Sequence, residues 1–301
     1  MSCPDLSLKL LQALCDKDQK TVDECAKDKS VKEWIDNHVD QQHIESAIFT
    51  FKNQYKDITC LCFASRYNNT RTVKQLVETG ADVTLADSIG NTPLHWVAGS
   101  KIEIKEKVDY LLSCDASLVR SQNLFDNTQL LQAAFEGNTN AISVFIQWGV
   151  DVNEPGKFAT TALHRACGHG RVACIHELMR HGADVEAKEG RFKATPLQLA
   201  VHFNHPACVK VLLDAYSASI NATNKFGDTA LHRAGFNGNL KVVKLLTSYS
   251  KCDVTAKNND GKTAADLARE QGHNNIVDYL TSLGMCEYVY TYTLLSFVLS
   301  S

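Results

Sequence analysis

The residues best suited to metal binding or nucleophilic chemistry lie close together between positions 164 and 181. Imidazole and thiolate groups are preferred ligands of zinc, and this stretch contains both. Its candidates are His164, Cys167, His169, Cys174, His176 and His181. Zinc ligands are usually paired about two to four residues apart and converge on the ion from both sides. We nevertheless expect no metal here, because these residues serve different positions of a repeated pattern.

A second short motif, Gly261-Lys262-Thr263, resembles the end of a phosphate-binding loop. Such a loop needs an earlier glycine, which would fall at position 256, but that position holds Ala256. No strand is predicted before it, so we expect Gly261 to end a loop and Thr263 to begin a helix. The sequence also lacks a Gly-x-Ser-x-Gly elbow and a His-Glu-x-x-His pair. We therefore predict a protein that is not an enzyme and has no cofactor.

The threonines of the chain follow a regular pattern that accounts for most of these residues. The string Thr92-Pro93-Leu94-His95 is followed by Ala98, and related strings begin at Thr128, Thr161, Thr195, Thr229 and Thr263. The intervals are 36, 33, 34, 34 and 34 residues, and a weaker copy begins at Thr59, 33 residues before Thr92. Thr-Pro-Leu-His-x-x-Ala at about 33 residues resembles the ankyrin repeat. The resemblance implies an all-α solenoid of helix-turn-helix units with projecting β-hairpin loops.

Each repeat is expected to contain two helices. The threonine begins the first helix, and an apolar run with i, i+3, i+4 spacing forms one face of the second, as at Val108, Leu111 and Leu112. The second repeat has extra residues near 101–107, which we expect to lengthen its second helix. A glycine nine residues after the threonine suits the turn between the helices, because glycine tolerates positive φ. These glycines are Gly137, Gly170, Gly238 and Gly272.

The repeat pattern divides the chain into three predicted regions. Residues 1–55 form an N-terminal helical cap or degenerate repeat, residues 56–284 form an array of about seven repeats, and residues 285–301 form a short apolar tail. The uncharged residues 288–299 are too few to span a bilayer as a helix, which needs about 20 residues. Three interpretations of the tail remain open: a segment that covers the last repeat, a weak anchor for a membrane or partner, and a terminus without a selected role.

Composition and cysteine usage limit the expected partners and compartment. The formal net charge of -3 at pH 7 provides no overall basic surface for nucleic acid or for an acidic membrane. Eleven cysteines stand at irregular spacings, and the N-terminus has no signal-peptide pattern, so we expect reduced thiols. These features predict a monomeric protein of the cytoplasm, and also of the nucleus. We expect it to bind no nucleic acid and to contact membranes only through its tail.

The positions at which the repeats differ are candidates for recognising a partner. The resemblance implies that the fourth, seventh and eighth residues after each threonine point into a concave groove or border it. Large aromatic side chains with arginines, as found in the middle of the array, are typical of interface hot spots. Alternatively, the aromatics pack between repeats and the arginines pair with neighbouring carboxylates. The candidate groove residues are Tyr67, Trp96, Phe135, Arg165, His169, Phe203, Arg233 and Phe236.

A second recurring position lies three residues before the threonine. It is apolar in five consecutive copies, and the resemblance places it near the tip of the projecting loop. The phenylalanines at this position either form a ridge that a partner covers or shield their neighbouring loops. They are Phe125, Phe158, Phe192 and Phe226. The resemblance also implies that a loop asparagine can be hydroxylated by an asparaginyl hydroxylase, and Asn153 and Asn221 occupy that place.

Together these patterns predict a non-catalytic interaction module or scaffold that binds another protein through the groove and the loop tips. The partner segment is expected to carry acidic and apolar side chains. Two other functions remain open. One is an adaptor that recruits a second protein or a membrane through the N-terminal cap or the C-terminal tail. The other is an enzyme or ligand sensor with a pocket that no motif reveals.

Overall fold

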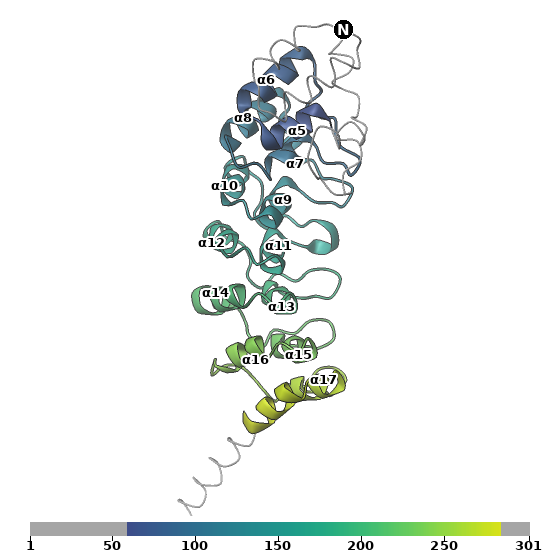
Figure 1. Ribbon diagram of the computed structural model, residues 1–301, viewed down its shortest axis with the longest axis vertical. Helices are drawn as coiled ribbons and strands as arrows, with labels where there is room; N and C mark the ends of the chain where they lie inside the picture. The colour runs from purple at the N-terminus through teal and green to yellow at the C-terminus, as the bar shows by residue number, and fades with distance from the viewer. Residues whose placement is uncertain (1–58, 284–301) are drawn as a thin grey trace, which may run out of the picture. The chain divides into compact units, whose positions relative to one another are not determined.

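The computed structural model of the protein describes residues 59–283, which form helical repeats (Figure 1). Two compact units meet in sequence between Lys157 and Phe158, and each is described by itself. The described residues contain α-helices and two short 3-10 helices, with no strand among them. None of these helices has the length and hydrophobicity needed to cross a bilayer. The all-α prediction is confirmed, whereas the predicted regions 1–55 and 285–301 lie outside the described residues.

In the first unit, helices from successive repeats form two layers. The first helices are α5 (Cys60–Tyr67), α7 (Pro93–Val97) and α9 (Gln129–Glu136), and the second helices are α6 (Thr70–Thr79), α8 (Ile104–Cys114) and α10 (Thr139–Gln147). Helix α7 contacts α5 and α9, and α8 contacts α6 and α10. Helix α8 has 11 residues, compared with 10 in α6 and 9 in α10, so the extra residues of the second repeat lie in α8 and in the loop before it, as predicted. The 3-10 helix η1 (Ala116–Arg120) follows α8.

The second unit repeats this arrangement. Its first helices are α11 (Ala162–Gly168), α13 (Pro196–His202), α15 (Ala230–Phe236) and α17 (Ala264–Glu270), and its second helices are α12 (Val172–Arg180), α14 (Pro206–Tyr216) and α16 (Leu240–Thr247). A further helix begins at residue 274, and its described part ends at 283. Consecutive first helices contact one another, as do consecutive second helices, so each layer is a stack of neighbours (Figure 1). The 3-10 helix η2 (Lys157–Ala159) lies where the units meet in sequence.

The motif threonine fixes the start of each first helix. The hydroxyl of Thr161 accepts a hydrogen bond from the backbone N–H of His164 at 3.5 Å, and Nδ1 of His164 accepts one from the N–H of Thr161 at 3.3 Å. This capping box satisfies N–H groups that the helix leaves without an intrahelical partner. Gln198 takes the place of the histidine in α13 and makes the same pair of bonds with Thr195.

The motif histidine also ties each repeat to the next. Nε2 of His95 lies 3.0 Å from the carbonyl oxygen of Asn127, and Nε2 of His164 lies 3.1 Å from that of Ala194. A carbonyl oxygen only accepts, so Nε2 carries the proton and Nδ1 remains an acceptor for the threonine N–H. Burial disfavours a second proton, which would also break this cap. Burial accordingly lowers the pKa of His95 to about 4 and lowers that of His164 as well.

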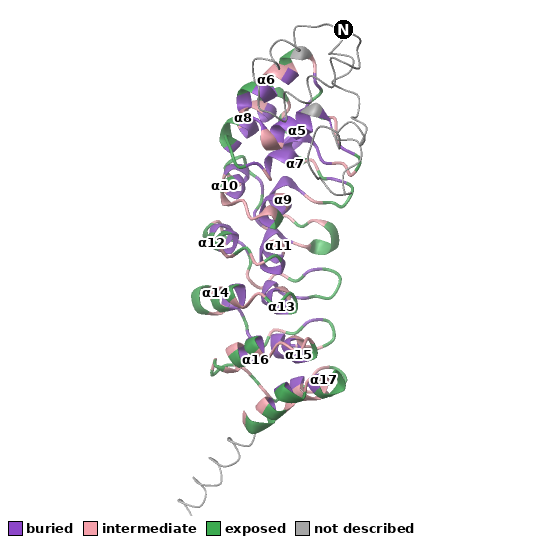
Figure 2. Cartoon of the chain, in the orientation of Figure 1, coloured by how far each residue is buried: buried purple, intermediate pink, exposed green. Residues whose placement is uncertain are grey.

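The apolar runs of the second helices form much of the core, which Figure 2 shows as buried segments in both layers. On α8, Val108 and Leu111 are fully buried, and on α12 Ile175 and Leu178 are fully buried. Burying one such side chain stabilises the fold by about 1.5–3 kcal/mol. Because each run packs against neighbouring repeats, the stability of a repeat depends on its stacking partners.

The charged side chain of Lys107 on α8 lies inside the first unit. It is fully buried, and its Nζ donates to the carbonyl oxygens of Ser65 at 2.9 Å and Asn68 at 3.0 Å and to the hydroxyl of Ser100 at 2.7 Å. A buried ammonium is tolerated only when hydrogen bonds replace its hydration. Lys107 therefore joins α8 to the C-terminal end of α5 and to the loop before α8. No pattern in the sequence predicts this burial.

Candidate functional site

In several projecting loops, the side chain of one polar residue accepts backbone hydrogen bonds that hold the tip in a turn. In the loop after α14, Oδ1 of Asn224 accepts hydrogen bonds from the backbone N–H groups of Phe226 at 2.8 Å and Asp228 at 3.0 Å. Asn123 accepts from Phe125 at 2.9 Å in the same way. These side chains hold a turn without a strand ladder. The tip phenylalanine therefore projects from a defined backbone.

In the second unit, the tip phenylalanines are exposed and cations lie over their rings. Phe158, Phe192 and Phe226 are 54%, 37% and 46% exposed. The guanidinium carbon of Arg191 lies 6.0 Å from the ring centroid of Phe158 and 5.1 Å from that of Phe192. Nζ of Lys225 lies 4.7 Å from the centroid of Phe192 and 5.0 Å from that of Phe226. We call these five residues the tip ladder.

Hydrogen bonds between successive loops hold the tip ladder together. The N–H of Lys225 donates to the carbonyl oxygen of Phe192 at 2.8 Å, and the N–H of Gly190 donates to that of Phe158. Nζ of Lys225 also donates to the carbonyl oxygen of Arg191 at 2.8 Å. The cation of one loop therefore lies over the ring of the preceding loop. Neighbouring cations therefore cover some of the surface of these rings, and a partner that covers the row stays a prediction.

The first unit has one comparable tip. Phe125 is exposed, and Nζ of Lys157 lies 5.9 Å from its ring centroid. The loop before it carries Ile89 at the same position, which is half-buried. The row of exposed aromatic rings thus belongs mainly to the second unit when each unit is considered alone.

Trp96, a predicted groove residue of the first unit, is instead part of the interior. It is 5% exposed, and its Nε1–H donates to Oδ2 of Asp87 at 3.0 Å. The prediction that Trp96 offers a binding surface is therefore wrong, because the indole packs inside with its only donor bound to a loop carboxylate. Tyr67 is half-buried, with its ring centroid 4.8 Å from that of Phe63, whereas Phe135 is exposed.

An ion pair occupies other predicted groove positions of the first unit. Nη1 and Nη2 of Arg66 donate to the two carboxylate oxygens of Glu136 at 2.8 and 3.1 Å. The guanidinium passes close to Gly99 on the intervening repeat, where a Cβ would collide with it. A glycine at this position therefore leaves room for a bidentate contact between α5 and α9.

In the second unit, the equivalent positions form an exposed surface. Phe203 and Phe236, at the ends of α13 and α15, are 54% and 41% exposed. The ring of Phe203 packs over α11, because a Cβ on Gly168 would lie 3.4 Å from it. The guanidinium carbon of Arg233 lies 5.8 Å from the ring centroid of Phe236. We call this surface the Arg-Phe patch; its residues are Arg165, His169, Phe203, Arg233 and Phe236.

The Arg-Phe patch is electropositive because of its arginines. Burial lowers the pKa of His169, and nearby Arg165, Arg171 and His205 lower it further. Burial also lowers the pKa of His202, with a further contribution from Arg233. Both imidazoles are thus neutral at pH 7. Burial lowers the pKa of Arg165 too, but a guanidinium remains charged at neutral pH.

The residues of the zinc hypothesis have separate surroundings. Cys174 is buried, which raises the pKa of its thiol to about 11. Nδ1 of His176 lies 2.6 Å from the hydroxyl of Tyr216, and Nε2 of His181 lies 3.2 Å from a carboxylate oxygen of Glu177. Within residues 59–283, no three His, Cys, Asp or Glu side chains are grouped as metal ligands would be.

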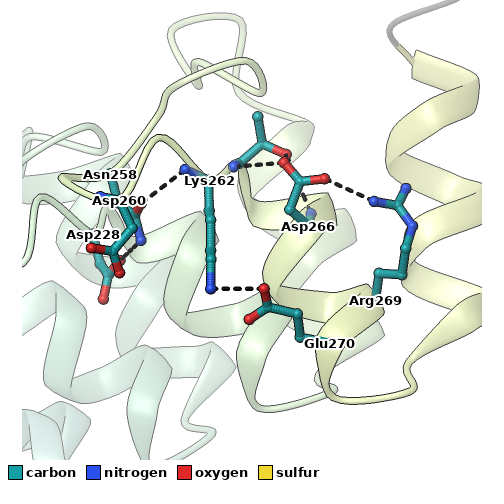
Figure 3. Close-up of polar contacts among 8 residues, drawn as sticks. Asp228, Asn258, Asp260, Lys262, Asp266, Arg269 and Glu270 are labelled. Carbon is teal, nitrogen blue, oxygen red and sulfur yellow. Dashed lines mark hydrogen bonds and ion pairs between the residues drawn. The ribbon is translucent and has the colours of Figure 1, made fainter.

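The motif Gly261-Lys262-Thr263 lies at the end of a loop and the start of α17 (Figure 3). Oδ1 of Asn258 accepts from the N–H of Lys262 at 3.0 Å, and Thr263 caps α17 in a capping box with Asp266. Nζ of Lys262 pairs with Glu270 at 2.7 Å. The segment therefore has the loop-and-cap structure predicted from the repeat, with its lysine bound to a carboxylate of the same repeat.

The two candidate hydroxylation sites differ in their contacts. The side-chain amide of Asn221 donates to the carbonyl oxygen of Lys251 at 2.7 Å and accepts from the N–H of Asp253 at 3.0 Å, although the residue as a whole is exposed. Asn153 is half-buried, and its backbone N–H donates to Oδ1 of Asp151 at 2.9 Å. Hydroxylation of either residue stays a prediction.

A comparison with known families accounts for the stacked helix pairs and their threonine caps. The family model described as "Ankyrin repeats (3 copies)" matches residues 22–122, 102–189, 130–224 and 197–289. The chain belongs to the ankyrin-repeat family. Ankyrin repeats are protein-protein interaction modules, so the exposed ends of the first helices and the loop tips are the surfaces to consider. The first match begins within the region predicted as a cap, before the described residues.

Three relatives of this ankyrin-repeat chain illustrate how partial the similarity is. The potassium channel AKT1 of Oryza sativa subsp. indica is 40% identical over 58 residues, which are 19% of this chain and 6% of the channel. Neurogenic locus notch homolog protein 1 of Xenopus laevis is 29% identical over 127 residues, 42% of this chain and 5% of that protein. The palmitoyltransferase AKR1 of Debaryomyces hansenii is 32% identical over 120 residues, 38% of this chain and 14% of the enzyme. The chain therefore spans 14% or less of the length of each of these relatives.

The ankyrin motif did not reveal the side chains that shape the loop tips. Four of them stand five residues before a motif threonine, and Glu189 stands six residues before Thr195 because its loop is longer by one residue. Recurring Asn or Asp at such a position is a signal for a turn. The loop-shaping residues are Asp87, Asn123, Glu189, Asn224 and Asn258.

The cations of the tips were also missed, although the sequence contains a signal for them. A lysine or arginine directly precedes the tip phenylalanine in three consecutive copies, as Lys157-Phe158, Arg191-Phe192 and Lys225-Phe226. The structure shows that each of these cations lies over the ring of the phenylalanine of the preceding loop. Arg191 and Lys225 also lie over the adjacent phenylalanine of their own loop.

Proposed function

We propose that this ankyrin-repeat protein is a non-catalytic interaction module whose Arg-Phe patch binds a protein segment that carries carboxylates and apolar side chains. The observation that supports the proposal is the exposure of Phe203 and Phe236 at the ends of α13 and α15, with Arg233 over the ring of Phe236 and Arg165 on the neighbouring helix α11. Aromatic and arginine side chains are the residues most enriched at interface hot spots. Carboxylates of the partner would pair with the guanidinium groups, and its apolar side chains would cover the rings.

The helices hold these side chains in place before a partner arrives. Asn237 at the end of α15 donates from its side chain to the carbonyl oxygen of His202 at 2.9 Å, and Nε2 of His205 lies 3.1 Å from the carbonyl oxygen of Gly168. These contacts connect consecutive first-helix ends. A pre-formed surface loses little conformational entropy on binding, which favours affinity. Arg233 makes no ion pair with a carboxylate within residues 59–283, so its charge is available to a partner.

We also propose that the protein works in the cytoplasm or nucleus as a monomer. Cys62, Cys114, Cys167, Cys174, Cys208 and Cys252 form no disulfide, which suits a reducing compartment. Fractionation of cells that express the tagged chain, followed by gel filtration of the soluble fraction, tests both statements. Recovery in a secreted or oxidised form, or elution as a dimer, would contradict them.

The binding proposal is tested by co-purification of the full chain with Arg165→Glu and Arg233→Glu combined. We expect this variant to lose its specific partners by at least about tenfold, because it replaces two attractive charges with two repulsive ones. A second variant, Arg165→Gln with Arg233→Gln, removes the charges with less disturbance of the half-buried positions. Its loss of partners should be smaller.

A matched control is Lys210→Glu with Lys241→Glu, which makes the same change in net charge. Both lysines are exposed and lie on the second helices α14 and α16. We expect this variant to retain its partners. If the Arg-Phe variants retain the same partners with an unchanged thermal melt, the patch is not the binding surface.

A further inference from the structure

We propose that the tip ladder (Phe158, Arg191, Phe192, Lys225 and Phe226) is a second docking surface that binds an acidic protein segment with interspersed apolar side chains. The ladder is built from loop tips, whereas the Arg-Phe patch is built from the ends of first helices. The inference rests on the proposed function in one respect, since its occupant is also a protein segment. Its binding residues are separate, so the two surfaces can be tested independently.

The aromatic side chains of the ladder come from three successive loops. The rings of Phe192 and Phe226 have centroids 6.1 Å apart, so one apolar side chain of a partner can contact both. Phe158 lies next in the row, joined to Phe192 through the guanidinium of Arg191. Single exposed apolar residues are common on protein surfaces, but a contiguous row marks an interaction site.

The charged part of the ladder selects for carboxylates. Arg191 and Lys225 are both exposed, and within residues 59–283 neither forms an ion pair with a carboxylate. The nearest acid in sequence, Glu189, is buried and accepts hydrogen bonds from the N–H groups of Arg191 at 2.7 Å and Phe192 at 2.6 Å. Its charge therefore stabilises the turn and does not cover the cations from outside.

Three residues of the ladder loops have a left-handed backbone conformation. Phe158 and Ala159 have φ values of 57° and 52°, and Lys193 has a φ of 57°. Left-handed backbone is unfavourable for non-glycine residues, because the Cβ atom approaches the following carbonyl oxygen. Such conformations are retained where the surrounding structure or a ligand-binding role requires them. Here they flank the rings of Phe158 and Phe192, whose positions the inter-loop hydrogen bonds also maintain.

The geometry favours an acidic protein segment over single-stranded nucleic acid. Bases bind such surfaces by stacking on free aromatic faces, but Arg191 and Lys225 both lie over Phe192. The row also ends quickly, because the next loop carries Asp260 where the earlier loops carry phenylalanine. A carboxylate at this end would repel a continuing phosphate backbone. A short segment that spans three loops avoids this repulsion.

The test uses the full chain and a fluorescein-labelled peptide composed of glutamate, leucine, phenylalanine and glycine, with binding followed by fluorescence anisotropy. We expect the combined variant Arg191→Glu with Lys225→Glu to weaken binding by about tenfold or more, since two attractions become repulsions. Phe192→Ala should weaken it by about three- to tenfold through the loss of ring contacts. If the charge reversal prevents folding, the variant Arg191→Met with Lys225→Met takes its place, because methionine keeps the aliphatic part of both side chains. This variant should also lower the affinity for the peptide.

Three comparisons make the result specific to the ladder. Lys210→Glu with Lys241→Glu changes net charge equally and should leave peptide binding unchanged. In the background of Arg165→Glu with Arg233→Glu, which disables the Arg-Phe patch, the ladder variant should still weaken the remaining peptide binding by about tenfold. A peptide in which lysine replaces glutamate should not bind.

Several outcomes would overturn the inference. These are an absence of peptide binding by the unmodified chain, equal binding by the folded ladder variants, and an equal loss in the Lys210 and Lys241 control. Tighter binding of a single-stranded oligothymidine than of the peptide would assign the ladder to nucleic acid instead. If only the Arg-Phe variant loses the peptide, the ladder fails while the proposed function stands. If the Arg-Phe variant keeps its cellular partners while the ladder variants lose the peptide, the ladder stands and the proposed function of the Arg-Phe patch fails.

Discussion

The same repeat position serves different purposes in the two units. Four residues after the motif threonine, the first unit has Trp96 and the second has Arg165 and Arg233. Trp96 is buried with its N–H bound to Asp87, whereas both arginines are half-buried and Arg233 lies over the ring of the exposed Phe236. The backbone places all three residues at equivalent points of a first helix. The available partners decide whether the side chain stabilises the stack or remains accessible.

The neighbouring positions show the same contrast. In the first unit, Arg66 and Glu136 bind each other across an intervening glycine. In the second unit, Phe203 and Phe236 are exposed at the ends of their helices. The position of a residue in the repeat motif therefore identifies it as a candidate for binding a partner. A side chain that already bonds to another residue of the same unit is less available for that role.

The largest expected effect in this comparison comes from Trp96→Ala. We expect the free energy of unfolding to fall by about 3–5 kcal/mol, because the change empties a buried site and removes one of the hydrogen bonds to the carboxylate of Asp87. Urea unfolding followed by circular dichroism measures this loss. The control is Trp148→Ala, since Trp148 is exposed and its indole bonds to Asp109 at the surface; a loss below about 1 kcal/mol is expected. Equal losses in the two variants would contradict the burial contrast.

The motif histidine of the first unit should make stability depend on pH. The pKa of His95 is lowered by burial from 6.5 to about 4, so the unfolded chain binds the proton more readily between these values. Stability is therefore full above about pH 6.5 and is lost as the pH falls toward 4, with a loss of about 2 kcal/mol between pH 7 and 5. Urea titrations at the two pH values test this. His95→Gln, which copies Gln198 in another repeat, should remove that contribution; an unchanged pH slope would refute it.

The ion pair between Arg66 and Glu136 should contribute little to stability. Both side chains are partly exposed, at 22% and 23%, so we expect Arg66→Gln to cost less than about 1 kcal/mol. A double-mutant cycle with Glu136→Gln measures the coupling free energy. Partner capture should be unchanged in each variant, because this pair lies outside the Arg-Phe patch. Loss of the partners bound through that patch would show that the first unit also contributes to their recognition.

The smallest expected stability effect comes from Arg233→Ala. This residue makes no ion pair with a carboxylate in the described part of the chain, so the free energy of unfolding should change by no more than about 0.5 kcal/mol. Its effect should appear instead in partner co-purification, which we expect to decrease. A large stability loss with unchanged partner capture would make Arg233 structural and remove the contrast with Trp96.

Much of the fold follows from local signals. Thr161, Thr195 and Thr229 predict helix starts because a threonine side chain caps the helix N-terminus, and the capping boxes confirm it. Gly170 and Gly238 have positive φ at the turns between helices, as predicted from their spacing. The candidate site was less predictable. Trp96 and Phe236 look equally suited to an interface in sequence, but only the structure shows that Asp87 binds the indole of Trp96.

The sequence by itself therefore determined the repeat length, the starts of the first helices and the apolar face of each second helix, because these depend on residues close together along the chain. The tertiary structure alone decided which side chains are used internally. Lys107 is buried because its acceptors include the carbonyl of Ser65, 42 residues away. Lys225 lies over Phe192 because stacking brings successive loops together. Such contacts connect neighbouring repeats, so they depend on the packed array and not on the motif within one repeat.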